Sequence, residues 1–146
     1  MKTCLSLVIL VCTFSFNSFA DCVVKDTDGN ERLAVVGNEV VTPFNEVLFK
    51  LGPDKDDLQA QYQRIYAHKW KGRWMAGTYL VVRQSDVFSM VSDSTFLTWD
   101  GTGRIFAKTP IAIGTVTGIG DSTCSSDQVG LGAFALWFLK NGDESN

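Results

Sequence analysis

The segment "HKWKGRW" at residues 68–74 concentrates side chains that could bind a ligand or a partner protein. It holds the only histidine of the chain, two of its four tryptophans, one arginine and two lysines. Tryptophan can stack on a sugar ring or anchor a protein interface, and arginine can form paired hydrogen bonds with a carboxylate. We therefore predict four binding residues in this segment, namely His68, Trp70, Arg73 and Trp74.

The same segment also has a purely structural interpretation, as the end of a helix and the start of a strand. Lys69 and Lys71 would then lie at the negative end of the helix dipole, and Gly72 is a residue type that often ends a helix. The two tryptophans would close the buried faces of the helix and of the strand. Both interpretations stay open, with the helix end as the first and the contact surface as the second.

Trp99 is the other aromatic residue that we predict at a binding surface. It directly precedes the turn sequence "DGTG", which would place the indole ring at the rim of the fold. The surfaces expected to recognise a ligand are therefore the loops at residues 68–74, 99–104 and 118–128.

Residues that could form a catalytic site are scarce in this chain. The chain has one histidine but no G-x-S-x-G sequence, which would supply the nucleophilic serine of a catalytic triad. No glycine-rich stretch has the spacing of a P-loop. Most of the sixteen acidic residues fall in expected turns or at an expected helix start, although a carboxylate pair of the glycosidase type remains open. We predict no catalytic residue, no metal site and no cofactor.

The first twenty residues have the pattern of a secretory signal peptide. Lys2 supplies a positive start, an uncharged apolar run follows, and Ser18 and Ala20 occupy the −3 and −1 positions. The apolar run is shorter than the roughly 20 residues that cross a bilayer, although a membrane anchor is the alternative. We predict cleavage after Ala20, a single domain at residues 21–146, and a secreted or periplasmic protein without a membrane span.

Cysteine usage agrees with an oxidising compartment. Cys4 and Cys12 lie in the predicted leader, so Cys22 and Cys124 would be the cysteines of the mature chain. Two cysteines allow a single pairing, and they offer too few ligands with one histidine for a zinc site. We predict a disulfide between Cys22 and Cys124 that ties the first strand to the loop before the last strand.

The charge balance limits the classes of partner. The formal net charge is −3 at pH 7, and no stretch concentrates lysine and arginine. Binding to a phosphate backbone requires concentrated positive charge, so we expect no nucleic-acid partner. A protein or a glycan remains as the expected ligand.

The elements that would position these residues begin with a hairpin at residues 22–36, which turns at Asp28 and Gly29. Apolar spacing then predicts helices at residues 43–51 and 54–69. Short runs rich in β-branched and aromatic residues follow, and the last of them, "LGAFALWFL", is expected to be a buried strand. The predicted fold class is α+β, mainly an antiparallel sheet arranged as a small sandwich or barrel, with one or two helices inserted after the N-terminal hairpin.

These expectations favour a small exported, disulfide-tied binding protein that recognises a protein or glycan through a rigid surface. Inhibitors, immunity proteins, adhesin-like subunits and envelope accessory factors are the classes that fit. The alternative is a small secreted hydrolase that uses a carboxylate pair. A third hypothesis is a structural role in an assembly, with an unpaired strand edge as the contact surface.

Overall fold

The computed structural model describes residues 20–53, 63–70, 73–75, 80–89, 92–120 and 122–145. It describes the backbone alone for residues 67–70, 73–75 and 142–145. The predicted leader therefore lies outside the described residues, except for Ala20.

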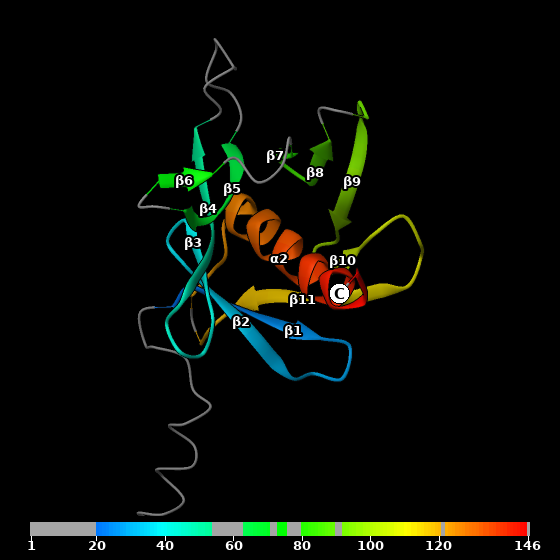
Figure 1. Cartoon of the computed structure of the whole chain (residues 1–146). Coiled ribbons are helices and arrows are strands. Elements are labelled where there is room, and N and C mark those ends of the chain that lie inside the picture. Colours follow the sequence, from blue (N-terminus) through cyan, green and yellow to red (C-terminus); the bar gives the residue numbers. More distant parts are fainter. Residues whose placement is uncertain are drawn as a thin grey trace, which may run out of the picture.

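Antiparallel strands and a C-terminal helix make up the described part of the chain (Figure 1). Each strand pairs with its neighbours in antiparallel register. The elements are β1 (Cys22–Asp26), β2 (Glu31–Val36), β3 (Glu39–Val41), β4 (Val47–Pro53), β5 (Gln63–Trp70), β6 (Arg73–Met75), β7 (Leu80–Val82), β8 (Asp86–Ser89), β9 (Ser94–Trp99), β10 (Arg104–Phe106), β11 (Ala112–Gly118) and α2 (Ser126–Ser145).

The sheet closes on itself into a barrel. Its strands follow the order β4-β3-β2-β1-β11-β10-β9-β8-β7-β5-β6, and β4 also pairs with β5. This pairing completes a ring from which only β6 is left out. Along one edge, β5 pairs with two different strands: Gln63 pairs with Val82 of β7, and Trp70 pairs with Arg73 of β6. Closure removes the exposed edges that an open sheet would present.

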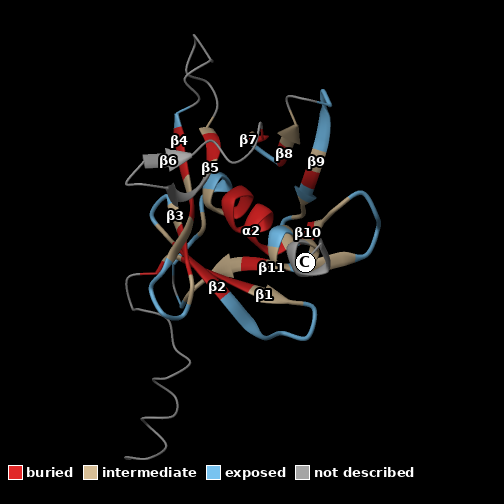
Figure 2. Ribbon diagram, viewed as in Figure 1, coloured by how far each residue is buried: buried red, intermediate tan, exposed pale blue. Residues whose placement is uncertain are grey.

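Helix α2 fills the interior of this barrel. It contacts strands all around the ring, namely β1, β2, β3, β4, β7, β8, β9 and β11. Every residue from Val129 to Leu136 is buried, which a helix lying on an outer surface would not allow (Figure 2). Burying each large apolar side chain contributes about 1.5 to 3 kcal/mol, so the contact between helix and strands is the core. Side chains that line it include Val24, Leu33, Val40, Ile65, Leu97 and Val116.

Two glycines of α2 allow the helix to fit. A Cβ atom at Gly130 would lie 2.5 Å from Cγ1 of Val82, and one at Gly132 would lie 3.0 Å from Cγ1 of Val116. Real Cβ atoms essentially never show the first separation and seldom the second, so larger residues at these positions would collide with the strands. The same glycines lower the intrinsic helix propensity, and packing compensates for that loss.

The predicted helices at residues 43–51 and 54–69 are wrong where the structure describes them. β4 and β5 occupy most of the described positions, while residues 54–62 lie outside them. Apolar residues in β4 happen to match a helical spacing, but Phe49 and Leu51 are the large side chains that it buries. They are two residues apart, as the alternating faces of a strand require.

The expected strand "LGAFALWFL" is also wrong, because this segment belongs to α2. A helix that is enclosed on all sides has no polar face, so its sequence lacks the 3.6-residue alternation that identifies surface helices. The prediction of a mainly antiparallel sheet with a helix is confirmed in this broad form. The helix is C-terminal, however, and is not inserted after the N-terminal hairpin.

Candidate functional site

The loops of the barrel lie at two ends, because successive antiparallel strands reverse direction. We call one end the disulfide end and the other the hairpin end. The described loops of the disulfide end are residues 37–38, 83–85, 100–103, 119–120 and 122–125, and α2 enters the barrel there. Those of the hairpin end are residues 27–30, 42–46, 92–93 and 107–111, together with the β5–β6 hairpin.

An open groove of about 390 Å³ lies at the disulfide end. The turn after β9 forms one wall, and the segment that leads into α2 forms the other. Trp99 is half-buried and lies on the same side of β9 as Leu97, so its ring covers the top of the barrel interior. The lining residues are Trp99, Asp100, Gly101, Thr102, Gly103, Val116, Thr117, Gly118, Ser122, Thr123, Cys124, Ser126 and Val129.

Asp100 holds the turn wall of the groove in place. Its Oδ1 accepts hydrogen bonds from the N–H of Thr102 at 2.9 Å, the hydroxyl of Thr102 at 2.7 Å and the N–H of Arg104 at 3.1 Å. Nε of Arg104 donates to Oδ2 at 2.8 Å. The Thr102 hydroxyl and the Arg104 groups hold the pKa of Asp100 well below its usual range. The turn is therefore held around an ionised carboxylate that is paired with Arg104.

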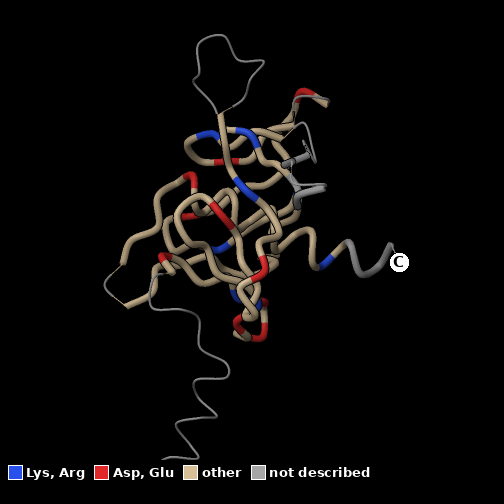
Figure 3. The backbone as a smooth tube through the Cα atoms, turned by 60° about the vertical axis from the view of Figure 1, so that its left-hand side comes forward, with Lys and Arg blue, Asp and Glu red and all other residues tan. Residues whose placement is uncertain are grey.

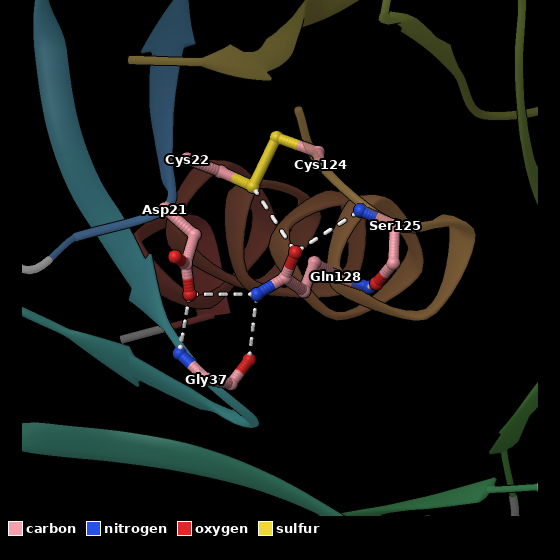
Figure 4. The surroundings of a disulfide bond; sticks show 6 residues. All are labelled: Asp21, Cys22, Gly37, Cys124, Ser125 and Gln128. Carbon is pink, nitrogen blue, oxygen red and sulfur yellow. Dashed lines mark hydrogen bonds between the residues drawn. A yellow bond between two sulfur atoms is a disulfide. The ribbon is translucent and has the colours of Figure 1, made fainter. Parts of the chain in front are cut away.

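The disulfide between Cys22 and Cys124 holds the other wall (Figure 4). It joins residues 102 positions apart in the sequence, with their Cα atoms 5.8 Å apart, and the predicted pairing is present. Gln128 lies beside it, with Oε1 3.8 Å from Sγ of Cys22. Because a disulfide sulfur carries no hydrogen, this is a packing contact.

Gln128 links three segments at this end. Its Nε2 donates to Oδ2 of Asp21 at 2.9 Å and to the carbonyl oxygen of Gly37 at 3.0 Å (Figure 4). The N–H of Gly37 also donates to Oδ2 of Asp21, at 2.8 Å. The start of β1, the β2–β3 turn and the first turn of α2 are thus joined by hydrogen bonds that supplement the disulfide.

Ser125 and Gln128 also cap α2. The N–H of Gln128 donates to Oγ of Ser125 at 3.2 Å, and the N–H of Ser125 donates to Oε1 of Gln128 at 3.0 Å. This reciprocal pair is a capping box, S-x-x-Q before an apolar run. Our sequence analysis missed it, although "SSDQ" at residues 125–128 was a readable sign of a helix start.

The structure separates the predicted binding residues. Trp99 lines the groove, and two of the three expected recognition loops, 99–104 and 118–128, meet there. In the segment at residues 68–74, residues 68–70 belong to β5 and residues 73–74 to β6, at the other end, where Trp70 pairs with Arg73. The interpretation of this segment as a helix end is therefore wrong. The side chains of its four predicted binding residues lie outside the described part, so their role stays a prediction.

Hydroxyl side chains line the same groove as Trp99, and the sequence analysis did not single them out. Within the described residues, the hydroxyls of four groove residues have no hydrogen-bond partner in the protein. They therefore remain able to donate to and accept from a ligand. They belong to Thr117, Ser122, Thr123 and Ser126.

Three of the described carboxyl groups have shifted pKa values. A hydrolytic pair needs one carboxyl with a raised pKa, whereas the shifted pKa values of Asp26, Asp86 and Asp100 are all lowered. Asp86 accepts paired hydrogen bonds from Arg83, at 2.8 and 2.6 Å, and another from Thr95 at 2.9 Å. These hydrogen bonds lower its pKa, and they fix the β7–β8 turn.

Three wider properties of the described part bear on possible ligands. Acidic and basic residues are interspersed along the chain and do not gather into one basic patch (Figure 3). No group of three or more His, Cys, Asp or Glu side chains among the described residues is placed to hold a metal ion. None of the described helices has the length and hydropathy needed to cross a membrane.

No family model, curated protein or solved structure matches this chain. Its function is therefore argued from the groove itself.

Proposed function

We propose that this protein is an exported binding protein whose recognition surface is the groove at the disulfide end. The observation that carries the proposal is the way the groove is built. Its two walls come from distant parts of the chain, and each is held by its own bonds: the Asp100 turn on one side, and the disulfide with the Gln128 network on the other. A surface that is rigid before binding loses little conformational entropy on binding.

The disulfide also supports the proposed location. Disulfides persist in oxidising compartments, and this one joins the two cysteines that cleavage after Ala20 would leave in the mature chain. Export through a cleaved leader and a stable covalent link at the groove are consistent with each other.

Comparing variants at the two ends tests the proposal. The purified protein, Trp99→Ala at the groove and Phe44→Ala at the hairpin end would be immobilised and exposed to secreted fractions, envelope fractions and a glycan array. Phe44 is a suitable control because it is 91% exposed on a loop at the far end. We expect Trp99→Ala to lower ligand retention about tenfold or more, and Phe44→Ala to retain ligand as the parent protein does.

The opposite result would contradict the proposal. If Phe44→Ala loses the ligand while Trp99→Ala keeps it, recognition takes place at the hairpin end, where the segment at residues 68–74 also lies. Circular dichroism of both variants would confirm that each retains the fold.

A further inference from the structure

The groove differs in charge from the other hollows of the described surface. One of these hollows has Lys25 and Glu31 in its lining, a second has Arg32 and Lys140, and a third has Lys108. Among the described residues, the lining of the groove at the disulfide end holds no lysine or arginine, and the carboxylate that it holds, that of Asp100, is already paired with Arg104. The described lining therefore offers no unpaired cation to a carboxylate, sulfate or phosphate group of a ligand.

The polar groups of the groove are mostly uncharged hydroxyls. Thr117, Ser122, Thr123 and Ser126 can each donate one hydrogen bond and accept others. Asp100 adds an acceptor that stays ionised, since its low pKa keeps the proton off. A ligand that suits this lining carries several neutral groups that both donate and accept.

Trp99 supplies the apolar part of the site. Its Cη2 atom would lie 3.2 Å from a Cβ atom at Gly130, so one edge of the indole is held against the helix. A tryptophan in a fixed position next to hydroxyl groups can receive the apolar C–H face of a sugar ring while the sugar hydroxyls reach the surrounding polar groups.

We propose that the groove binds a neutral saccharide, which stacks on Trp99 and forms hydrogen bonds with the hydroxyls of Thr123 and its neighbours. The volume of about 390 Å³ lies within the range of small-ligand sites, about 300 to 1,000 Å³. This inference rests on the function proposed above, and it specifies the chemical class of the ligand. Because the described lining holds no cation, we expect a neutral sugar to be preferred over an acidic one.

A glycan array of matched neutral and sialylated oligosaccharides tests the charge argument, with the oxidised, purified protein as the probe. We expect binding to neutral glycans, and at least about tenfold weaker binding when the same glycan ends in sialic acid. Hits would be titrated by calorimetry to obtain Kd. A preference for the sialylated members, or no binding to any neutral glycan, would overturn the inference.

Three substitutions then place the saccharide in the groove. Trp99→Ala should weaken binding about tenfold or more, whereas Trp99→Phe, which keeps an aromatic face and fills the barrel mouth, should retain most of it. Thr123→Val removes one exposed hydroxyl with little change in shape, and should weaken binding about threefold to tenfold. Thr98→Val is the matched control, because Thr98 is exposed on β9 but does not line the groove.

The two proposals can fail separately. If no saccharide binds, yet Trp99→Ala and Thr123→Val both abolish retention of a protein ligand, the groove is a recognition surface and the saccharide inference is wrong. If saccharide binding is unaffected by Trp99→Ala and Thr123→Val, the saccharide does not occupy the groove, and the inference is also wrong.

Discussion

At the hairpin end, Asp26 accepts hydrogen bonds from the N–H groups of Asp28 and Asn30, each at 3.0 Å, and Arg32 lies 3.4 Å from its carboxylate. At the disulfide end, Asp100 accepts in the same way from residues two and four positions later, with Arg104 as its ion-pair partner. A glycine with positive φ follows three residues after each aspartate, +84° in one turn and +86° in the other. The two turns share one local design.

The surroundings of the two turns differ. In the described part of the chain, the side-chain hydrogen bonds of the Asp26 turn and of the Thr42 turn, both at the hairpin end, join residues no more than six positions apart. At the disulfide end, Gln128 bonds with segments 107 and 91 residues away, and the disulfide spans 102 residues. Changes at the disulfide end should therefore destabilise the whole fold, and changes in these hairpin turns should act locally.

Removing the disulfide should produce the largest effect. The double variant Cys22→Ser, Cys124→Ser frees a loop of about 100 residues in the unfolded chain, which corresponds to a loss of about 4 to 5 kcal/mol in the free energy of unfolding. Urea denaturation with and without reductant would measure it. A loss below about 1 kcal/mol would show that the hydrogen bonds at this end hold the loops without the covalent link.

Gly130→Ala should give the second largest effect. The added methyl group would lie 2.5 Å from Val82, and overpacking of this kind costs about 1 to 3 kcal/mol. Alanine favours the helix by about 1 kcal/mol over glycine, so a variant without this clash would be more stable. Thermal unfolding measures the sign of the change.

The double variant Gly130→Ala, Val82→Ala tests whether the contact with Val82 causes the destabilisation by Gly130→Ala. Its destabilisation should be smaller than the sum of the two single changes, because the shortened residue 82 leaves room for the methyl group. Additive effects would show that the helix does not press against β7 at this point.

Gln128→Ala and Thr42→Ala compare the two ends directly. Gln128→Ala removes one of the two hydrogen bonds of the capping box, that from the N–H of Ser125, together with the bonds to Asp21 and Gly37, and should cost about 1 to 2 kcal/mol. Thr42→Ala removes bonds to the nearby N–H groups of Phe44 and Glu46, and should cost about 0.5 to 1 kcal/mol. Hydrogen exchange should show increased opening across several strands in the first variant and only near the loop in the second. Equal patterns of exchange would contradict the difference between the ends.

Asp26→Asn and Asp100→Asn should have the smallest effects, and they depend on pH. The pKa of each aspartate is lowered on folding, so each stabilises the protein above its ordinary pKa of 3.8. That contribution is lost as the pH falls below about 4 towards the folded-state value. Each variant should therefore show a weaker loss of stability on acidification than the parent protein.

The two aspartate substitutions should differ in their effect on ligand binding. We expect Asp100→Asn to weaken binding at the groove about threefold or more, since it loosens the turn that forms one wall. Asp26→Asn, at the far end, should bind as the parent does. Equal binding by both variants would argue that the Asp100 turn plays no part in recognition.

Sequence reasoning found the parts of the fold that depend on neighbouring residues. The hairpin β1–β2 turns at Asp28 and Gly29, and the hairpin β9–β10 encloses the "DGTG" turn, as predicted. The position of Trp99 at the rim was also predicted, because a place directly before a tight turn is a local property. The place of Ser122 and Thr123 in the same groove was not, since nothing near them in the sequence indicates it.

The wrong predictions concern segments whose conformation depends on contacts with residues far away in the sequence. Residues 129–136 are apolar on every side of α2 because strands surround them, and periodicity cannot distinguish such a helix from a buried strand. The capping box at Ser125 and Gln128 was the one local signal that could have resolved the choice.

The sequence by itself determined the tight turns and most of the strands, because these follow from side-chain types. It also determined the pairing of Cys22 with Cys124, because two cysteines outside the predicted leader allow a single pairing. The tertiary structure alone decided that β4 meets β5 and that a helix enters the barrel. It also decided that the loop after β9 lies beside the segment before α2. These contacts join residues far apart in the chain, and their free energy comes from burying surfaces that exist only once the barrel has closed.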